Sequence, residues 1–286
     1  MNPYKIKKAV SKKAKKVKEL IKTSSENINS KSYVDMIFQD GEKTVDSNTL
    51  IIKAQNRVLN SVKNGIEYPP FVDKSEEFLR NHVNSRVHIF VMYVDLVGST
   101  NLTLSLPVEK IVTIVSSFAQ EMAYTVTQFG GYMLKFVGDA VLAYFNAENE
   151  LIYPADNIIN CAKSMLKVIT VGINPILTIS GYPPLAAKIG IDHGQNIIVR
   201  YGSDIKKSHV DILGPSMNMA AKIQNMAEPN QLLIGEDVYN KLHPETQKSF
   251  KKKTFSETKW KYHHRVTGKL YPIYAYTIDE VSTESD

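Results

Sequence analysis

The chain has almost no cysteine, since Cys161 is the single one among 286 residues. One cysteine excludes a framework of intramolecular disulfides and is typical of a reducing compartment. The segment around Cys161 is apolar with a helical pattern. We therefore interpret this thiol as buried filler and not as a reactive group. These features predict a cytoplasmic protein.

The sequence also lacks a long uninterrupted apolar run. The first 22 residues contain no apolar core of the kind that a secretory signal needs. The most apolar later stretch, residues 165–179, is broken by Lys167, Asn174 and Pro175. A stretch of this length is too short to cross a bilayer, so we expect a soluble protein.

Acidic residues are scarce in the N-terminal arm, which holds most of the positive charge. Residues 1–27 contain nine lysines against Glu19 and Glu26, a net charge of +7. Because the whole chain carries +6, the remaining 259 residues carry 6 − 7 = −1. Residues 3–23 show a narrow apolar helical stripe. Two interpretations stay open: a solvated helix that packs this stripe on a neighbour, or a contact with a membrane surface or nucleic acid.

Residues 1–84 have too little apolar content for a large core of their own, and we expect a helical accessory segment there. Within it, Asp46-Ser47 predicts the start of a helix over 48–63, and Asn64-Gly65 predicts its end. A second short helix is expected near 74–84. Residues 85–280 are expected to form the main domain.

The main domain shows an alternation of strand and helix patterns. Residues 87–94 are apolar at nearly every position, as in a central strand that is covered on both faces. The further strands are predicted at 132–137, 140–145, 186–192, 196–201, 231–234, 259–266 and 272–277. Helices are predicted at 107–129, 154–173 and 216–227, and a short helix after the strand at 231–234 is expected to end at 242. The order strand, helix, hairpin, helix, strand predicts a ferredoxin-like α+β fold with helices on one sheet face.

Two aspartates stand where strands reverse direction. Asp95 ends the first strand, and Asp139 lies 44 residues later at the tip of a hairpin. In a ferredoxin-like sheet the first strand lies beside that hairpin, so both carboxylates should reach one edge. Mg²⁺ prefers one or two carboxylates together with substrate phosphates. The pattern therefore predicts a metal site for phosphoryl chemistry, with residues 96–100 supplying backbone N–H groups and hydroxyls to a triphosphate.

Three segments then carry a resemblance to a known family. They are Asp95-Leu-Val-Gly-Ser-Thr100, Lys135-Phe-Val-Gly-Asp139 and Asp211-Ile-Leu-Gly-Pro-Ser-Met-Asn218-Met-Ala-Ala-Lys222. In this order and spacing they resemble the signature segments of class III nucleotidyl cyclases, over about residues 86–278. Diguanylate cyclases fit less well, because Gly130-Gly131 is followed by Tyr-Met and not by an acidic pair.

The resemblance implies an adenylate cyclase that converts ATP to 3′,5′-cyclic AMP and pyrophosphate. Asp95, Leu96 and Asp139 match the positions that hold two Mg²⁺ or Mn²⁺ ions. Lys135 and Asp211 match the positions that select the base, and this pair favours adenine. The other matched positions are Asn218 for the ribose, Lys222 for the transition state, and Val97, Gly98, Ser99, Thr100 and Lys269 for the triphosphate.

Two positions depart from the family pattern. The family usually has arginine where this chain has Lys222, so the bidentate fork of a guanidinium is lost. Thr267 stands where the family has a phosphate-binding lysine, and Lys269 is the candidate substitute. Both departures predict modest turnover or an altered substrate.

The resemblance also implies a head-to-tail homodimer with two composite sites, because this chain carries both the metal and the base-selecting residues. A monomer would then be inactive. Two alternatives stay open. The first is a cyclase for pyrimidine or other nucleotides, of the type used in antiphage signalling. The second is a degenerate, weakly active module that binds nucleotide and signals through dimerisation, against which the intact aspartate pair argues.

Overall fold

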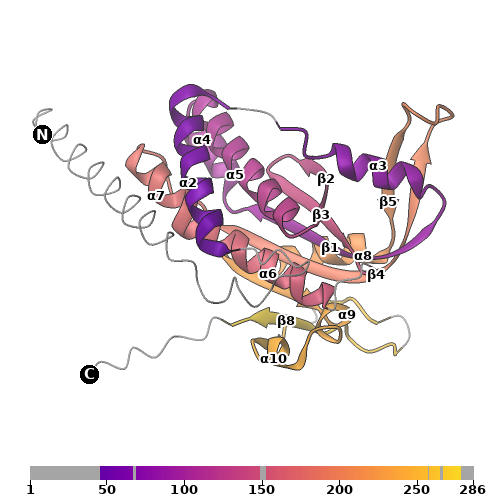
Figure 1. Ribbon diagram of the computed structural model, residues 1–286. Coiled ribbons are helices and arrows are strands. Elements are labelled where there is room, and N and C mark those ends of the chain that lie inside the picture. The colour runs from indigo at the N-terminus through magenta and orange to yellow at the C-terminus, as the bar shows by residue number, and fades with distance from the viewer. Residues whose placement is uncertain (1–45, 67–68, 149–152, 257, 265–266, 278–286) are drawn as a thin grey trace, which may run out of the picture.

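The computed structural model describes residues 46–66, 69–148, 153–256, 258–264 and 267–277 (Figure 1). The helix expected over 3–23, and with it the basic arm, lies outside the described residues.

The centre of the molecule is one sheet with the strand order β2-β3-β1-β4-β6-β8-β7, and β5 pairs with β4. The strands are β1 Arg86–Leu96, β2 Tyr132–Val137, β3 Ala140–Asn146, β4 Ala187–Tyr201, β5 His209–Leu213, β6 Gln231–Gly235, β7 Phe250–Lys253 and β8 Ile273–Tyr276. β1 lies between β3 and β4, both antiparallel to it, whereas β4 and β6 run parallel. The expected α+β class is confirmed, and so is the place of the first strand beside the hairpin.

Helices cover both faces of this sheet, and not one face as the sequence predicted (Figure 1). They are α2 Ser47–Asn64, α3 Asp73–Asn81, α4 Ser99–Ser105, α5 Val108–Gln128, α6 Pro154–Lys167, the π-helical turn η3 Val168–Ile173, α7 Asn174–Ile179, α8 Pro215–Asn225, α9 Glu236–Tyr239 and α10 Pro244–Gln247. The long helices α5 and α6 pack on the face that Phe90 and Met92 of β1 present. The opposite face, with Ile89 and Val91, packs against α3, α8 and β5.

Helix α2 begins and ends as the sequence predicts. The Asp46 carboxylate accepts hydrogen bonds from the backbone N–H groups of Asn48 and Thr49, and Gly65 ends the helix with φ 94°. Its buried face joins the core that α5 and α6 share. α2 therefore packs directly on the main domain, whereas the boundary expected near residue 84 stays a prediction.

One expected pair of strands is a single strand. Residues 186–192 and 196–201 were predicted to be separated by His193-Gly194-Gln195, but β4 runs unbroken through them. His193 and Gly194 pair with Phe90 and Ile89 of β1 in continuous register. The glycine marks no turn, and a Cβ on Gly194 would meet Cβ of Ser216 in α8 at 3.4 Å, an ordinary contact distance.

Smaller elements also differ from the prediction. The short elements α4, β5, α10 and β7 were not predicted. The strand expected over 259–266 is, in its described part, only an isolated bridge between His263 and Leu270. Trp260 is anchored there without a strand, since its indole N–H donates to the carbonyl of Tyr271 at 2.8 Å.

The helical run Pro154–Ile179 is longer than the helix expected over 154–173. By length and hydropathy alone it could span a membrane. Its buried side chains, among them Ile158, Met165 and Ile173, belong to the core under the sheet. We therefore interpret its apolar character as that of a core helix.

Candidate active site

Asp95 and Asp139 come together as the sequence predicts. Asp95 is the penultimate residue of β1, and Asp139 lies in the β2–β3 turn after Gly138, whose φ is 63°. β1 and β3 pair up to Val94 and Val141, which brings the turn next to the end of β1. Burial raises the pKa of Asp95, and the negative charge of Asp139 raises it further.

The two carboxylates have different surroundings. Oδ2 of Asp95 accepts a hydrogen bond from Nε2 of Gln224 at 3.2 Å. Lys188 of β4 lies opposite Asp95 in the β1–β4 register. Its positive charge lowers the pKa of Asp95 and so opposes the effect of burial. Oδ2 of Asp139, in contrast, is buried without a hydrogen-bond partner in the described part of the chain. A buried carboxylate oxygen without a donor is unfavourable unless something else, such as a cation, satisfies it.

This donor set fits a divalent cation that substrate phosphates also coordinate. No group of three or more His, Cys, Asp or Glu side chains that could hold a metal occurs among the described residues. The protein can offer the carboxylates of Asp95 and Asp139 and the backbone carbonyl of Leu96. Mg²⁺ is commonly held in this way, by one or two carboxylates with phosphates and waters.

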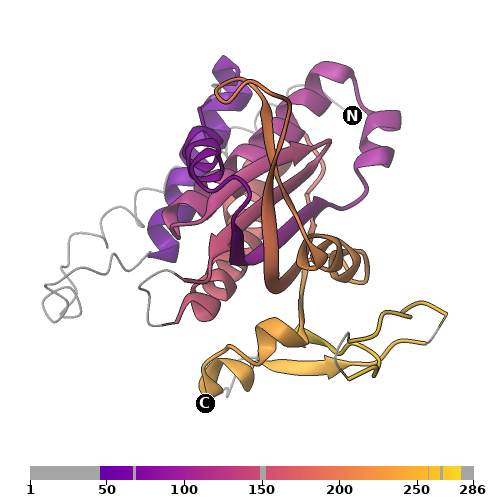
Figure 2. The ribbon, with the colours of Figure 1, turned by 90° about the vertical axis from the view of Figure 1, so that its right-hand side faces the viewer.

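Lys135 and Asp211 form an ion pair, with Nζ and Oδ2 at 2.5 Å. Lys135 comes from β2 and Asp211 from β5, which pairs only with β4 in the sheet. The contact exists because the β4–β5 hairpin folds back over one sheet face, where Val210 and Ile212 join the core (Figure 2). Both charged side chains stay partly open to solvent, at 37% and 15% exposure.

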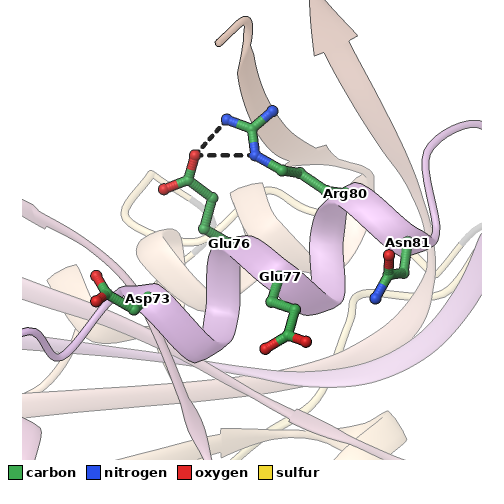
Figure 3. Close-up of a pocket in the computed structure, with 5 residues that line it drawn as sticks. All are labelled: Asp73, Glu76, Glu77, Arg80 and Asn81. Atoms are coloured by element: carbon green, nitrogen blue, oxygen red, sulfur yellow. Dashed lines mark hydrogen bonds and ion pairs between the residues drawn. The ribbon is translucent and has the colours of Figure 1, made fainter. Parts of the chain in front are cut away.

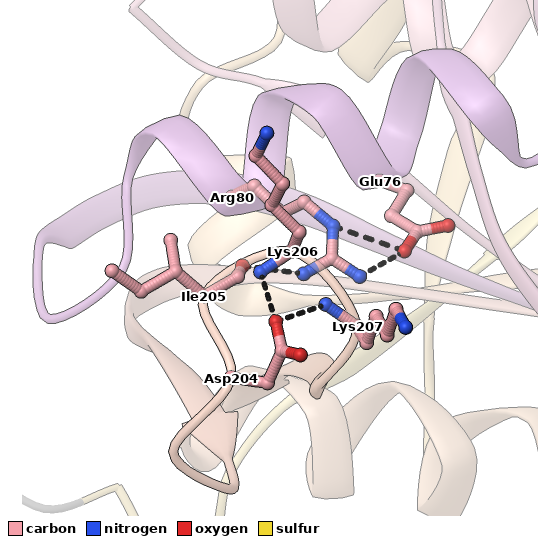
Figure 4. A network of polar contacts seen from close by, with 6 residues as sticks. All are labelled: Glu76, Arg80, Asp204, Ile205, Lys206 and Lys207. Atoms are coloured by element: carbon pink, nitrogen blue, oxygen red, sulfur yellow. Dashed lines mark hydrogen bonds and ion pairs between the residues drawn. The ribbon is translucent and has the colours of Figure 1, made fainter.

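Contacts with α3 hold the tip of this hairpin. Nη1 of Arg80 donates to the carbonyl of Ile205 at 3.1 Å, and the same guanidinium pairs with Glu76 (Figure 4). The tip itself is closed by Asp204, whose carboxylate accepts from the N–H groups of Lys206 and Lys207. α3 therefore helps to place β5, and with it Asp211.

A shallow hollow also lies along α3 (Figure 3). Its lining comes from this single helix, namely Asp73, Glu76, Glu77, Arg80 and Asn81. None of the predicted site residues lines it. We assign no function to this hollow.

Tyr93 lies on the same sheet face as Lys135. Both residues pair with Leu142 of β3, one from each side, so the three form a row across the sheet. The Tyr93 side chain is half-buried, and its pKa is raised by burial and by the negative charge of Asp211. Tyr93 thus lies one strand away from Lys135 on this face of the sheet.

Helix α8 presents Asn218 and Lys222 to solvent, one turn apart. α8 lies so close to β4 that a Cβ on Gly190 would come within 2.3 Å of the backbone N of Gln224. This close approach sets the height of α8 above the sheet and turns Gln224 toward Asp95.

The expected phosphate-contacting residues divide into two places. Val97, Gly98, Ser99 and Thr100 follow Asp95 and Leu96 in the chain, where Gly98 has φ 72° and α4 begins. Lys269 is exposed in a separate turn, in which its carbonyl accepts from the N–H of His264 at 2.8 Å. No described hydrogen bond or ion pair joins Lys269 to either aspartate.

Sequence reasoning missed Gln224, Lys188 and Tyr93. Lys188 and Tyr93 could have been found from strand register. Lys188 lies opposite Asp95 on the neighbouring strand, and Tyr93 precedes Asp95 by two residues, so both share the sheet face of Asp95. Gln224 follows Lys222 by two positions and so lies off the exposed face of α8. No local signal in the sequence distinguishes it from an ordinary helical glutamine.

The sequence matches a known protein family and several curated proteins. The family model described as "Adenylate and Guanylate cyclase catalytic domain" matches residues 82–275. A cytidylate cyclase of Escherichia coli is 24% identical over 243 residues, which cover 78% of this chain and 52% of that protein. A cytidylate cyclase of Staphylococcus aureus is 28% identical over 218 residues, 74% of this chain and 50% of that protein. The chain thus spans about half the length of these curated relatives.

A solved structure shows a related fold. The crystal structure of the guanylyl cyclase Cya2 covers 70% of this chain and 98% of its own, with a TM-score of 0.58 and 21% identity. At this identity the similarity shows the fold alone.

Proposed function

The chain belongs to the family of adenylate and guanylate cyclase catalytic domains, and on this basis we propose that it converts a nucleoside triphosphate to a 3′,5′-cyclic nucleotide and pyrophosphate. The observation that carries the proposal is the pair Asp95 and Asp139, with Oδ2 of Asp139 buried and unpartnered among the described residues. Such an arrangement is unfavourable in a module that binds no cation.

Asp95, Asp139 and the carbonyl of Leu96 are the groups that would hold two Mg²⁺ or Mn²⁺ ions. Two such ions, when bound, supply Lewis-acid activation of the ribose 3′-hydroxyl and neutralise the charge of the leaving pyrophosphate. The protein's contribution is to bring the two carboxylates together. Their burial and mutual repulsion, which raise the pKa of Asp95, would be relieved by bound cations.

The Lys135–Asp211 pair supports a base that carries an exocyclic amine. Lysine only donates hydrogen bonds, and an ionised aspartate only accepts them. Adenine and cytosine both present an amine beside an unprotonated ring nitrogen, whereas guanine and uracil present a carbonyl beside a ring N–H. The pair therefore favours ATP and CTP over GTP and UTP.

Between these two substrates we propose CTP. Both of the curated relatives compared above are cytidylate cyclases, and each match covers about three quarters of this chain. ATP is the second candidate, because the Lys135–Asp211 pair would bind the amine edge of adenine as well.

Asn218 and Lys222 are proposed to act from α8. Their exposure and their spacing of one turn let one contact the ribose while the other approaches the triphosphate. An ammonium at Lys222 would stabilise the charge that develops in the transition state. Val97 to Thr100 and Lys269 are proposed to contact the phosphates.

We further propose a head-to-tail homodimer in which the metal-binding aspartates of one protomer face the Lys135–Asp211 pair of its partner. Phe136 and Val137 flank the Asp139 turn and are exposed at 41% and 54%. Apolar side chains beside a polar site are expected to be covered when a second copy binds.

The test is product formation by the purified chain with each of ATP, GTP, CTP and UTP, in Mg²⁺ or Mn²⁺. We expect cyclic CMP in excess over cyclic AMP, little product from GTP or UTP, and loss of product in Asp139→Asn. Turnover of GTP or UTP alone would overturn the proposed role of Lys135 and Asp211. No product from any substrate in the dimeric protein would favour the degenerate binding module.

The basic arm and the location stay predictions. Contact of residues 1–27 with a membrane surface or nucleic acid is tested by deleting them and measuring salt-dependent retention on vesicles and on DNA or RNA. A cytoplasmic location is tested by fractionation.

A further inference from the structure

The Gln224 side chain is buried, at 5% exposure, and its amide points at a carboxylate. Nε2 of Gln224 donates to Oδ2 of Asp95 at 3.2 Å, a contact between residues 129 positions apart. Buried amides are expected to find partners. Here the partner is one of the two proposed metal ligands.

The helix that carries Gln224 is held at both ends. At the first turn of α8, the side chains of Ser216 and Asn196 exchange hydrogen bonds at 2.8 and 2.9 Å. Toward the other end the backbone packs against Gly190, where a Cβ would lie 2.5 Å from the carbonyl of Ala220. The position of the Gln224 amide is therefore set by the fold.

We propose that Gln224 is a positioning residue for Asp95, which holds the carboxylate in the orientation that a divalent cation needs. This inference rests on the proposed function, because it concerns the same metal site. An ionised carboxylate has about four lone-pair positions, so one hydrogen bond from Gln224 leaves the others free for the cation. A neutral amide does this without placing a competing cation beside the metal.

Asp95 and Asp139 differ in a way that supports this role. Oδ2 of Asp139 has no hydrogen-bond partner in the described structure, so its orientation depends on the short β2–β3 turn. Asp95 stands at a strand end and receives the only side-chain hydrogen bond recorded for either aspartate in the described part of the chain. Partners behind a metal ligand commonly change metal affinity or activity by about 10- to 100-fold.

The rival explanation is that Gln224 only fills space between α8 and the sheet. A double-mutant cycle separates the two explanations, because a residue that acts through Asp95 has no further effect once Asp95 is changed. The variants are Gln224→Met, Asp95→Asn and the double variant. Asn225→Ala is the matched control, since Asn225 is the exposed next residue of α8. Gln224→Leu replaces Gln224→Met if the latter melts well below the unaltered protein.

The measurement is Mn²⁺ binding by the full chain, followed by electron paramagnetic resonance with inorganic pyrophosphate present. We expect Gln224→Met to weaken Mn²⁺ binding about 10-fold, and Asn225→Ala to leave it unchanged. The Mn²⁺ concentration for half-maximal cyclase rate should rise by a similar factor, with a smaller loss of rate at saturating Mn²⁺. In the Asp95→Asn background, Gln224→Met should change nothing further.

Unchanged Mn²⁺ affinity in Gln224→Met would overturn the inference, as would an equal loss in the Asp95→Asn background. If the unaltered protein binds Mn²⁺ through Asp95 but makes no cyclic nucleotide, the proposed activity fails while the binding data still decide the role of Gln224. If the unaltered protein binds no Mn²⁺, both the proposed function and the inference are overturned.

Discussion

Lys135 and Asp211 meet across one face of the sheet, with Nζ and Oδ2 at 2.5 Å, although their strands are not neighbours. The β4–β5 hairpin makes the contact by folding over that face, and Arg80 of α3 holds its tip. A donor and an acceptor are thereby presented together to a base.

Reversing the hydrogen bonding of the pair should reverse the preference among bases. In Lys135→Glu combined with Asp211→Asn, the acceptor and the donor exchange places. We expect kcat/KM for CTP and ATP to fall about 10- to 100-fold and the relative use of GTP to rise. Steady-state kinetics with four triphosphates measure this. His209→Gln, 3.7 Å from Asp211, is the control and should keep the original order.

Removing the charge of Asp139 should inactivate the protein while stabilising its metal-free form. Asp139→Asn loses a proposed metal ligand, and we expect at least a 100-fold loss of rate. In EDTA, the same change removes the repulsion that raises the pKa of Asp95, so the melting temperature should rise or stay the same. A lower melting temperature in EDTA would contradict the proposed balance of charges.

Gly190 should be the most sensitive glycine of β4. In Gly190→Ala the new Cβ would overlap the backbone of α8 at 2.3 Å, whereas Gly194→Ala would meet only Cβ of Ser216 at 3.4 Å. We expect Gly190→Ala to lower the free energy of unfolding by about 1–3 kcal/mol and to abolish most activity. Urea denaturation of both variants measures the difference, and Gly194→Ala should be the milder one.

The Arg57–Glu121 pair should couple α2 to the main domain. Glu121 is buried, and Arg57 binds it through two hydrogen bonds of 2.7 and 2.5 Å. We expect Arg57→Met to lower the free energy of unfolding by about 3 kcal/mol, since it leaves a buried carboxylate unpaired. Adding Glu121→Gln should recover part of this loss. Two separate unfolding transitions would show that α2 is not part of the same cooperative unit.

Folding stability should fall in acid partly because of His193. Burial lowers the pKa of His193 to about 4, and the positive charge of Lys241 adds to this effect. The unfolded chain therefore binds more protons between about pH 6.5 and 4, so the free energy of unfolding decreases as the pH falls through that window. His193→Gln should flatten this dependence by up to about 3 kcal/mol. His209→Gln changes an exposed histidine and is the control, which should not flatten the dependence. Chemical denaturation of the two variants across pH measures the free energy of unfolding.

Much of the site could be predicted because its signals are local. An apolar strand followed by Asp95, and a hairpin turn around Gly138-Asp139, are patterns within a few residues. Their juxtaposition needed only the rule that the first strand lies beside the hairpin. The ends of α2 were predictable for the same reason, since the Asp46 cap and Gly65 act on adjacent backbone groups.

The sequence by itself determined the α+β class, the family and the two aspartates, because each depends on short-range patterns. Only the tertiary structure decided that β4 is continuous, that β5 brings Asp211 to Lys135, and that Gln224 reaches Asp95. These relationships join residues that are far apart in the chain. Their cause is the close approach of α8 to Gly190 and the folding of the β4–β5 hairpin over the sheet, which no local pattern encodes.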